Sequence, residues 1–239
     1  MEKKHLYNSK IGKIKWFIKR FGIKEIYRKP LRRIFAPLII KLIPKRQFLF
    51  EGEKYNLFYH QYNITWANER CVEIPVIKDI VSSSREDVLE IGNVLSHYFH
   101  TDWDIVDKFE KGKNIINKDI LEFKPTKKYG LIVSISTFEH IGYDDNTLTD
   151  SKGKILECFN NIKRNCMKKD GLIIITTPVG YNPDMDNIIF SNKLKFNKSC
   201  FLKRNHSGWI QVNKKEASKI KYGKPFPYAN CVFIGFYKK

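Results

Sequence analysis

The stretch "VLEIGNVLSHYF", Val88 to Phe99, joins a short apolar strand to an acid, Glu90, and a glycine, Gly92, ahead of a helix-like segment. A strand that passes through a glycine into a helix is how a nucleotide-binding loop begins. The further glycines of a G-x-G-x-x-G fingerprint are missing, because Val94 and Leu95 follow instead. A pyrophosphate needs those glycines to approach backbone N–H groups closely. The stretch therefore argues against a nicotinamide dinucleotide site.

Apolar strands separated by polar connectors follow along the chain. They are "WDIVD" (103–107), "NIINKDI" (114–120), "YGLIVSISTFEHIG" (129–142), "LIIITTP" (172–178) and the tail "NCVFIGFYKK" (230–239). A helix is expected over 151–171, with Gly171 as its C-cap. The connectors 108–114 and 120–128 are too short or irregular for full helices. The pattern predicts an α/β fold with a doubly wound, mainly parallel Rossmann-like sheet and helices on both faces.

Polar residues follow four successive strands of this predicted sheet. They are Glu90, Gly92 and Asn93 after the first, Asp107 and Lys108 after the second, Asp119 after the third, and Ser136 to His140 after the fourth. Ligands of doubly wound sheets bind outside the carboxyl ends of the strands. We therefore expect a binding site where these loops meet.

The segments "VLEIGN", "DIVD", "NKDI", "LIVSISTFEHIG" and "KDGLIIITTP" resemble the motifs of class I S-adenosylmethionine-dependent methyltransferases, over roughly residues 60–239. The resemblance implies that Glu90 and Gly92 line the methionine and sulfonium end of S-adenosyl-L-methionine. It places the ribose on Asp107 and the adenine on Asp119, with Ile120 beside it. Lys108, Ser136 and Asn93, which suits a positive φ, complete the expected cofactor site. This cofactor has no phosphate, which accounts for the missing glycines.

A hydroxyl that accepts a methyl group must lose its proton, and histidine is the usual base near neutral pH. His140 is the predicted base, with Glu139 as its neighbour, while a purely structural role for His140 stays open. No "NPPY"-type signature of amine methylation follows the fourth strand. The sequence therefore favours a hydroxyl acceptor over the exocyclic amines of bases.

Six residues are expected to bind the acceptor. They are Tyr62 and Arg70 from the segment before the sheet, Tyr181 and Asn182 after the fifth strand, and His206 and Trp209 further on. A tryptophan beside polar groups suits a sugar ring, and it equally suits an ordinary β-hairpin.

The first 50 residues form a basic amphipathic arm. They hold 15 Lys and Arg against two acids, within a chain of net charge +19. Ile11, Ile14, Phe17, Ile18 and Phe21 fall on one helical face. Three roles stay open for the arm: binding an anionic membrane surface, binding nucleic acid phosphates, or packing on the domain. The run "IFAPLII" is too short to cross a bilayer, which needs about 20 apolar residues.

The sequence thus predicts an arm (1–50), a helical cover of the pocket (51–86) and a Rossmann-like domain (87–239). The five cysteines are scattered and have no zinc spacing, so the sequence predicts no metal site and a reducing, cytoplasmic compartment. The basic arm adds the prediction of peripheral contact with the inner face of the membrane. The predicted function is methyl transfer to a hydroxyl of a sugar, glycolipid precursor or other small acceptor near the membrane. An RNA methyltransferase that uses the arm, and a non-catalytic methyltransferase-like module, remain alternatives.

Overall fold

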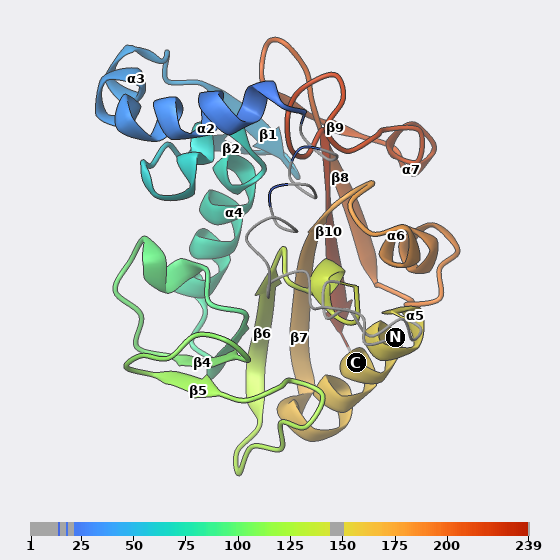
Figure 1. Ribbon diagram of the computed structural model, residues 1–239. Coiled ribbons are helices and arrows are strands. Elements are labelled where there is room, and N and C mark those ends of the chain that lie inside the picture. Colours follow the sequence, from blue (N-terminus) through green and yellow to red (C-terminus); the bar gives the residue numbers. More distant parts are fainter. Residues whose placement is uncertain (1–13, 15–17, 19–21, 144–150, 239) are drawn as a thin grey trace, which may run out of the picture.

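The N-terminal part of the molecule is not purely helical. The computed structural model describes Ile14, Ile18 and residues 22–143 and 151–238, so Ile11, Phe17 and Phe21 of the predicted apolar face lie outside the described residues. The elements before the main sheet are α2 (Lys24–Ile34), α3 (Ala36–Leu42), β1 (Gln47–Phe50), β2 (Glu53–Asn56), the 3-10 helix η2 (Tyr62–Ala67) and α4 (Arg70–Ser83) (Figure 1). The segment 51–86 thus starts with a strand of a small hairpin, where a helical cover was expected.

The main sheet has eight strands in the order β5-β4-β3-β6-β7-β10-β8-β9. These are β3 (Val88–Ile91), β4 (Asp104–Asp107), β5 (Ile115–Asn117), β6 (Tyr129–Ile135), β7 (Met167–Pro178), β8 (Lys198–Arg204), β9 (Trp209–Val212) and β10 (Cys231–Lys238). The strands from β5 to β7 are parallel, and β10, β8 and β9 add antiparallel pairs. The chain reverses its direction of winding between β3 and β6. The predicted doubly wound, mainly parallel sheet is therefore confirmed.

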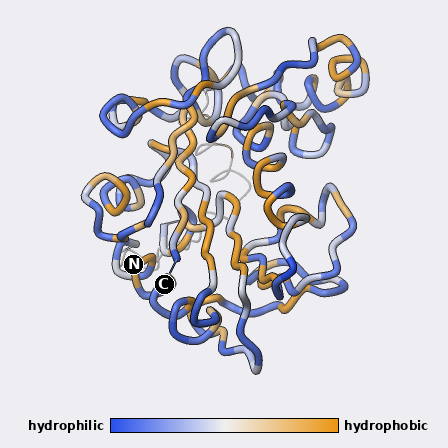
Figure 2. The backbone as a smooth tube through the Cα atoms, turned by 180° about the vertical axis from the view of Figure 1, so that it is seen from behind, coloured by the Kyte–Doolittle hydropathy of each residue, from blue (hydrophilic) through white to orange (hydrophobic). Residues whose placement is uncertain are grey.

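Both faces of the sheet are covered. One face packs against α5 (Ser151–Asn161), its continuation as a π-helical turn (Ile162–Cys166) and α6 (Pro183–Phe190), while α4 and the β1–β2 hairpin cover the other. A short helix, α7 (Lys214–Ala217), follows β9. Figure 2 shows apolar residues concentrated along the strands and α4, with hydrophilic residues at the loops. All five cysteines are buried in this fold and unpaired.

Gly171 is not the C-cap that the sequence predicts. The π-helical turn ends at Cys166, and β7 begins at Met167 without a loop. Gly171 lies instead at the irregular start of β7, where the register against β6 shifts and a Cβ would lie 3.2 Å from the Gly130 carbonyl oxygen. The glycine therefore allows a close approach of two strands.

The loops on the β3–β4–β5 side are short. The connection from β3 to β4 contains only the 3-10 turn η3 (Leu95–His97), and the expected absence of full helices in 108–114 and 120–128 is confirmed. The loop after β6 forms a second 3-10 turn, η4 (Phe138–His140). With no long helix in these connections, side chains at the carboxyl ends of the strands are left to form the site.

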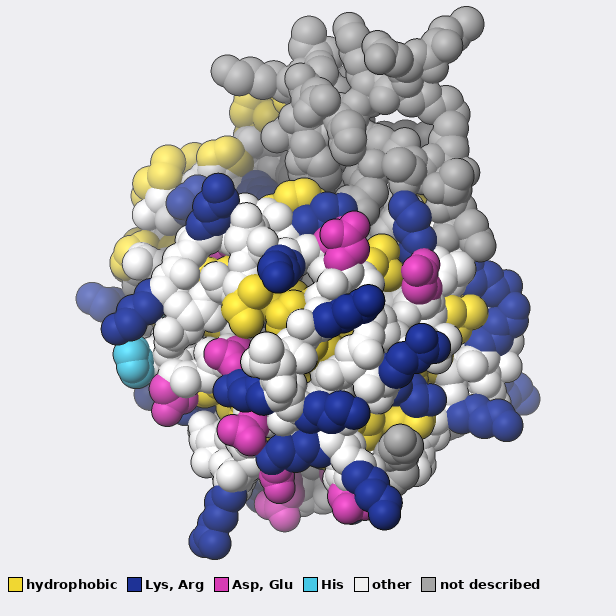
Figure 3. All heavy atoms as spheres, turned by 90° about the horizontal axis from the view of Figure 1, so that it is seen from below, with side chains coloured by type: hydrophobic (Ala, Val, Ile, Leu, Met, Phe, Trp, Pro, Cys, Tyr) yellow, Lys and Arg dark blue, Asp and Glu magenta, His cyan; other side chains and the backbone are white. Residues whose placement is uncertain are grey.

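Lysine and arginine predominate among the charged side chains on the face of the molecule seen from below (Figure 3). Figure 3 shows lysine and arginine side chains interspersed with acidic ones over the face seen from below. In the described part of the chain, no helix is long and apolar enough to cross a membrane.

Candidate functional site

The loop after β3 is organised from inside by Glu90. Its Oε1 accepts hydrogen bonds from the N–H groups of Val94 (2.9 Å) and Leu95 (2.8 Å), and its Oε2 accepts one from Trp103 Nε1 (3.0 Å). The side chain is completely buried, and this burial raises the pKa of Glu90 against the lowering effect of these hydrogen bonds. The sequence predicts Glu90 beside the methionine end of the cofactor. The structure corrects this prediction, because the Glu90 carboxylate faces its own loop and does not line the pocket described below.

Gly92 lies where the loops after β3 and β6 touch. Its φ is +82°, a conformation that side chains disfavour, and a Cβ there would lie 2.2 Å from Thr137 Oγ1. Its N–H donates to the Val106 carbonyl oxygen of β4 at 2.8 Å. The positive φ for which Asn93 is suited is thus adopted by Gly92 instead. A glycine is required here by both conformation and space.

Asp107, the last residue of β4, ties the loops after β3 and β4 together. Its Oδ1 accepts from the N–H groups of Phe109 (2.7 Å) and Glu110 (2.8 Å), and its Oδ2 accepts from the Asn93 N–H (3.1 Å). The Asn93 side chain points to Glu110 as well, with Nδ2 2.5 Å from Oε2. A carboxylate can accept about four hydrogen bonds. Asp107 therefore keeps an acceptor position on Oδ2 for a ligand.

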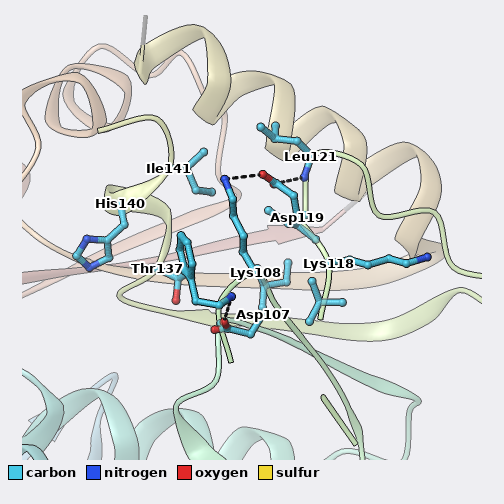
Figure 4. A pocket seen from close by; sticks show the side chains of 13 residues that line it. Asp107, Lys108, Lys118, Asp119, Leu121, Thr137, His140 and Ile141 are labelled. Carbon is cyan, nitrogen blue, oxygen red and sulfur yellow. Dashed lines mark hydrogen bonds and ion pairs between the residues drawn. The ribbon is translucent and has the colours of Figure 1, made fainter. Parts of the chain in front are cut away.

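Asp119 and Lys108 form an ion pair across the pocket. Lys108 Nζ lies 3.0 Å from Asp119 Oδ2, while Oδ1 accepts from the Leu121 N–H at 3.0 Å. Figure 4 shows the Lys108 side chain extending from the loop after β4 to Asp119. The pocket that remains has a volume of about 100 Å³, well below the roughly 300 Å³ or more of small-molecule sites. The ion pair between Lys108 and Asp119 therefore occupies part of the space at the pocket.

The pocket lies at the carboxyl ends of β3, β4, β5 and β6. It is lined by Ile91, Gly92, Val106, Asp107, Lys108, Phe109, Lys118, Asp119, Ile120, Leu121, Thr137, His140 and Ile141. Of the predicted residues it brings together Gly92, Asp107, Lys108, Asp119, Ile120 and His140. Sequence reasoning missed Thr137 and Phe109. Thr137 lies inside the quoted "STFEHIG" segment, and Phe109 is an apolar residue just after a strand-end acid, so both had a local signal.

Glu139 and His140 follow β6 and point to different environments. The His140 ring lines the pocket and meets the Tyr181 ring edge-on, with centroids 4.9 Å apart. Glu139 is 1% exposed, and its Oε1 lies 3.7 Å from His140 Nε2. Its other oxygen, Oε2, has no hydrogen-bond partner among the described residues. Burial raises the pKa of Glu139 to about 8, although His140 acts to lower it.

A buried polar network lies behind this loop. Glu73 Oε1 accepts from Ser136 Oγ and Thr176 Oγ1, both at 2.6 Å, and Glu73 Oε2 pairs with Arg70 Nη1 at 2.9 Å. Ser136, predicted to bind cofactor, directs its hydroxyl into this network and does not line the pocket. Arg70, predicted to bind the acceptor, is likewise engaged by Glu73. Both side chains thus contact the buried Glu73, and the predicted roles of Ser136 with the cofactor and of Arg70 with the acceptor stay predictions.

Two other predicted residues have clear local roles. Asn182 caps α6, because its Oδ1 accepts from the Asp184 N–H at 2.9 Å, and its Nδ2 donates to the Glu139 carbonyl oxygen at 2.8 Å. It is buried and holds the Glu139 loop in place. Tyr62 is half-exposed and stacks on His97 of the loop after β3, with ring centroids 4.6 Å apart.

Trp209 and His206 are separated from the pocket by the sheet order. Trp209 begins β9, five strands from β3, or about 24 Å at the usual strand spacing. It is 5% exposed and belongs to the core under α4. His206 lies in the β8–β9 turn and contacts Phe226. The chain forms an ordinary β-hairpin of β8 and β9 here, which was the alternative to a sugar-binding tryptophan.

The chain has similarity to solved structures at the level of the fold. No protein-family model and no curated protein sequence matches it. The N-methyltransferase NodS from Bradyrhizobium japonicum WM9, solved with S-adenosyl-L-homocysteine, is 11% identical with a TM-score of 0.44, over 69% of this chain and 83% of that one. A SAM-dependent methyltransferase from Archaeoglobus fulgidus is 17% identical with a TM-score of 0.38, over 64% and 85%. A putative methyltransferase from Thermoplasma acidophilum is 12% identical with a TM-score of 0.35, over 82% and 81%.

The fold assignment rests on this chain itself. Its strand order is that of a doubly wound sheet, and its pocket lies at the carboxyl ends of β3 to β6, beside the reversal in winding. The acids Asp107 and Asp119 follow adjacent strands of that sheet. The chain therefore has the doubly wound, mainly parallel α/β fold that its sequence predicts.

Proposed function

We propose that the chain is an S-adenosylmethionine-dependent methyltransferase that acts on a hydroxyl of a sugar, glycolipid precursor or other small acceptor near a membrane surface. One observation carries the cofactor assignment. The turn amides of Val94 and Leu95 are already bonded to the buried Glu90, while Asp107 and Asp119 line the pocket. A pyrophosphate would meet occupied donors and like charge. A ligand with hydroxyl and amino donors and a cationic sulfonium would meet acceptors.

The residues of the pocket fit such a cofactor. Gly92 provides a backbone surface without a Cβ, and Asp107 keeps an acceptor position for a ribose hydroxyl. Asp119, once Lys108 moves aside, can accept from the adenine amino group, with the apolar Ile120 beside it. When bound, the cofactor supplies the methyl group together with its own leaving group. The protein then has to position the acceptor and remove its proton.

His140 and Glu139 support a hydroxyl acceptor. His140 lines the pocket, with its Nε2 3.7 Å from Glu139 Oε1, and its imidazole is the base that accepts the hydroxyl proton. The Glu139 carboxyl group lies beside the imidazolium that forms and orients the ring at the pocket. The rings of Tyr181 and Tyr143, with centroids 6.0 Å apart, provide aromatic surface beside His140 that suits a sugar ring.

A ligand titration followed by thermal unfolding tests the cofactor. At about 100 times its dissociation constant, a ligand stabilises the folded state by roughly 2.7 kcal/mol, which raises the Tm by about 5–10 °C in a chain of this size. We expect this shift with S-adenosylmethionine and S-adenosylhomocysteine and none with NAD. Asp107→Ala should remove it. Asp102→Ala, an exposed acid outside the pocket, is the matched control and should keep it.

A shift of the Tm with NAD would contradict the proposal. The absence of a shift with both adenosyl compounds would also contradict it. The second result would leave the chain as a non-catalytic module with a methyltransferase-like fold.

A further inference from the structure

Helix α2 presents its apolar side chains to solvent. Ile23, Tyr27, Leu31 and Ile34 are spaced by four, four and three residues, so they form one stripe along the helix. All four are exposed, Tyr27 and Ile34 at 70%. The stripe continues past the break at Phe35 with the exposed Leu38 and Leu42 of α3. We call these residues, from Ile23 to Leu42, the outer stripe.

The polar side of α2 faces the protein instead. Glu25 is 3% exposed, and its Oε2 lies 2.8 Å from Arg32 Nη1. Both residues lie on a different side of the helix from the outer stripe. Residues of the 223–227 loop share a hollow with the N-terminal part of α2, including Glu25. A helix on a globular protein normally buries its apolar face. Here the side of α2 that carries the buried Glu25, paired with Arg32 of the same helix, lies against the protein, so packing on the domain does not account for the outer stripe.

Cations flank the outer stripe. Between residues 22 and 46 the chain has eight basic residues and one acid, the buried Glu25 that Arg32 neutralises. Lys24, Arg28, Arg33 and Lys41 are exposed. The surface therefore combines a continuous apolar stripe with a strong positive charge.

We propose that α2 and α3 dock the protein on an anionic lipid bilayer. The outer stripe enters the boundary between head groups and acyl chains, and the flanking cations contact the anionic head groups. A second copy of the chain would bring two positive surfaces together. A nucleic acid would satisfy the cations and leave the apolar side chains in water. The bilayer satisfies both components.

The docked surface lies on the side of the molecule that carries the loop after β3. Helix α2 contacts η2, and Tyr62 of η2 stacks on His97 of that loop. Figure 1 shows α2 and α3 beside β1, β2 and the upper end of α4. Together with the proposed function, on which this step rests, the placement makes the acceptor a lipid-linked molecule that reaches the pocket from the bilayer.

Vesicle sedimentation without any adenosyl ligand tests the docking. The probes are phosphatidylcholine vesicles with and without phosphatidylglycerol. We expect binding that requires phosphatidylglycerol and weakens with salt. The variant Tyr27→Ser/Leu31→Ser/Ile34→Ser should lose about tenfold or more in affinity, and Arg28→Gln/Arg33→Gln/Lys41→Gln a similar factor. Ile210→Ser, an exposed apolar residue on β9, is the matched control and should bind as the parent does.

Three results would overturn the docking: equal binding to neutral vesicles, unchanged binding of the Tyr27/Leu31/Ile34 variant, and a dimer in sedimentation equilibrium that this variant dissociates. Salt-sensitive binding to RNA without vesicle binding would assign the surface to nucleic acid. Thermal titration of the same variants with S-adenosylhomocysteine separates this test from that of the proposed function. The outer-stripe variants should keep the full shift, so failure of docking leaves the cofactor assignment intact.

Discussion

Glu90 lies on β3, and Glu139 lies just beyond the end of the adjacent strand β6. Both side chains are buried, yet their surroundings differ. Glu90 receives three hydrogen bonds that close the loop after β3. Glu139 keeps one oxygen without a partner among the described residues and has His140 beside it at the pocket. An unsatisfied buried polar group costs about 1–3 kcal/mol. The comparison indicates that the first acid stabilises the fold, whereas the second has the environment that the proposed reaction would use.

The largest effect should come from Glu90→Ala. This change leaves the N–H groups of Val94 and Leu95 and the indole N–H of Trp103 without an acceptor, at about 1–3 kcal/mol each. We expect the free energy of unfolding to fall by about 3 kcal/mol or more, measured by urea denaturation. Glu122→Ala, an exposed acid, should unfold like the parent protein. Equal midpoints for both variants would show that Glu90 does not hold the loop.

His140→Ala should affect the reaction without affecting the fold. Loss of a general base typically lowers the rate by about a hundredfold or more. The measurement is transfer of a labelled methyl group from S-adenosylmethionine to polar-lipid and nucleotide-sugar acceptors. His100→Ala, an exposed histidine in the loop after β3, is the control and should transfer normally. If His140→Ala also transferred normally, the role of His140 would be structural.

Glu139→Gln should show the smallest effect, and one that depends on pH. The pKa of Glu139 is about 8 in the folded state and 4.5 without the surrounding protein, so the folded state holds a proton that the unfolded chain releases between these values. Stability is therefore lost as pH rises through this range, and the glutamine variant avoids that loss. Its advantage in the free energy of unfolding should therefore grow as the pH rises from about 5 to about 9.

Urea midpoints of the two proteins at both pH values measure this difference. An advantage that stays constant with pH would mean that Glu139 ionises like an ordinary carboxyl group, and the contrast with Glu90 would then disappear.

The sequence by itself determined the parallel half of the sheet and the acids at its edge. The apolar run 129–135, which contains Ile and Val, predicts a buried strand, and parallel strands bring their carboxyl ends to one edge. For this reason Gly92, Asp107 and Asp119 could be predicted to lie together, as they do around one pocket.

Only the tertiary structure decided what each polar or amphipathic group faces. Glu73 bonds to Ser136 and Thr176, which are 63 and 103 residues away, and no local pattern encodes such partners. Trp209 is placed in the core by a strand order that a hairpin pattern does not specify. The spacing of α2 shows that it has an apolar face, but only the structure shows that this face is exposed while Glu25, on another side of the helix, is buried. Periodicity defines a face, whereas contacts between distant segments determine its neighbour.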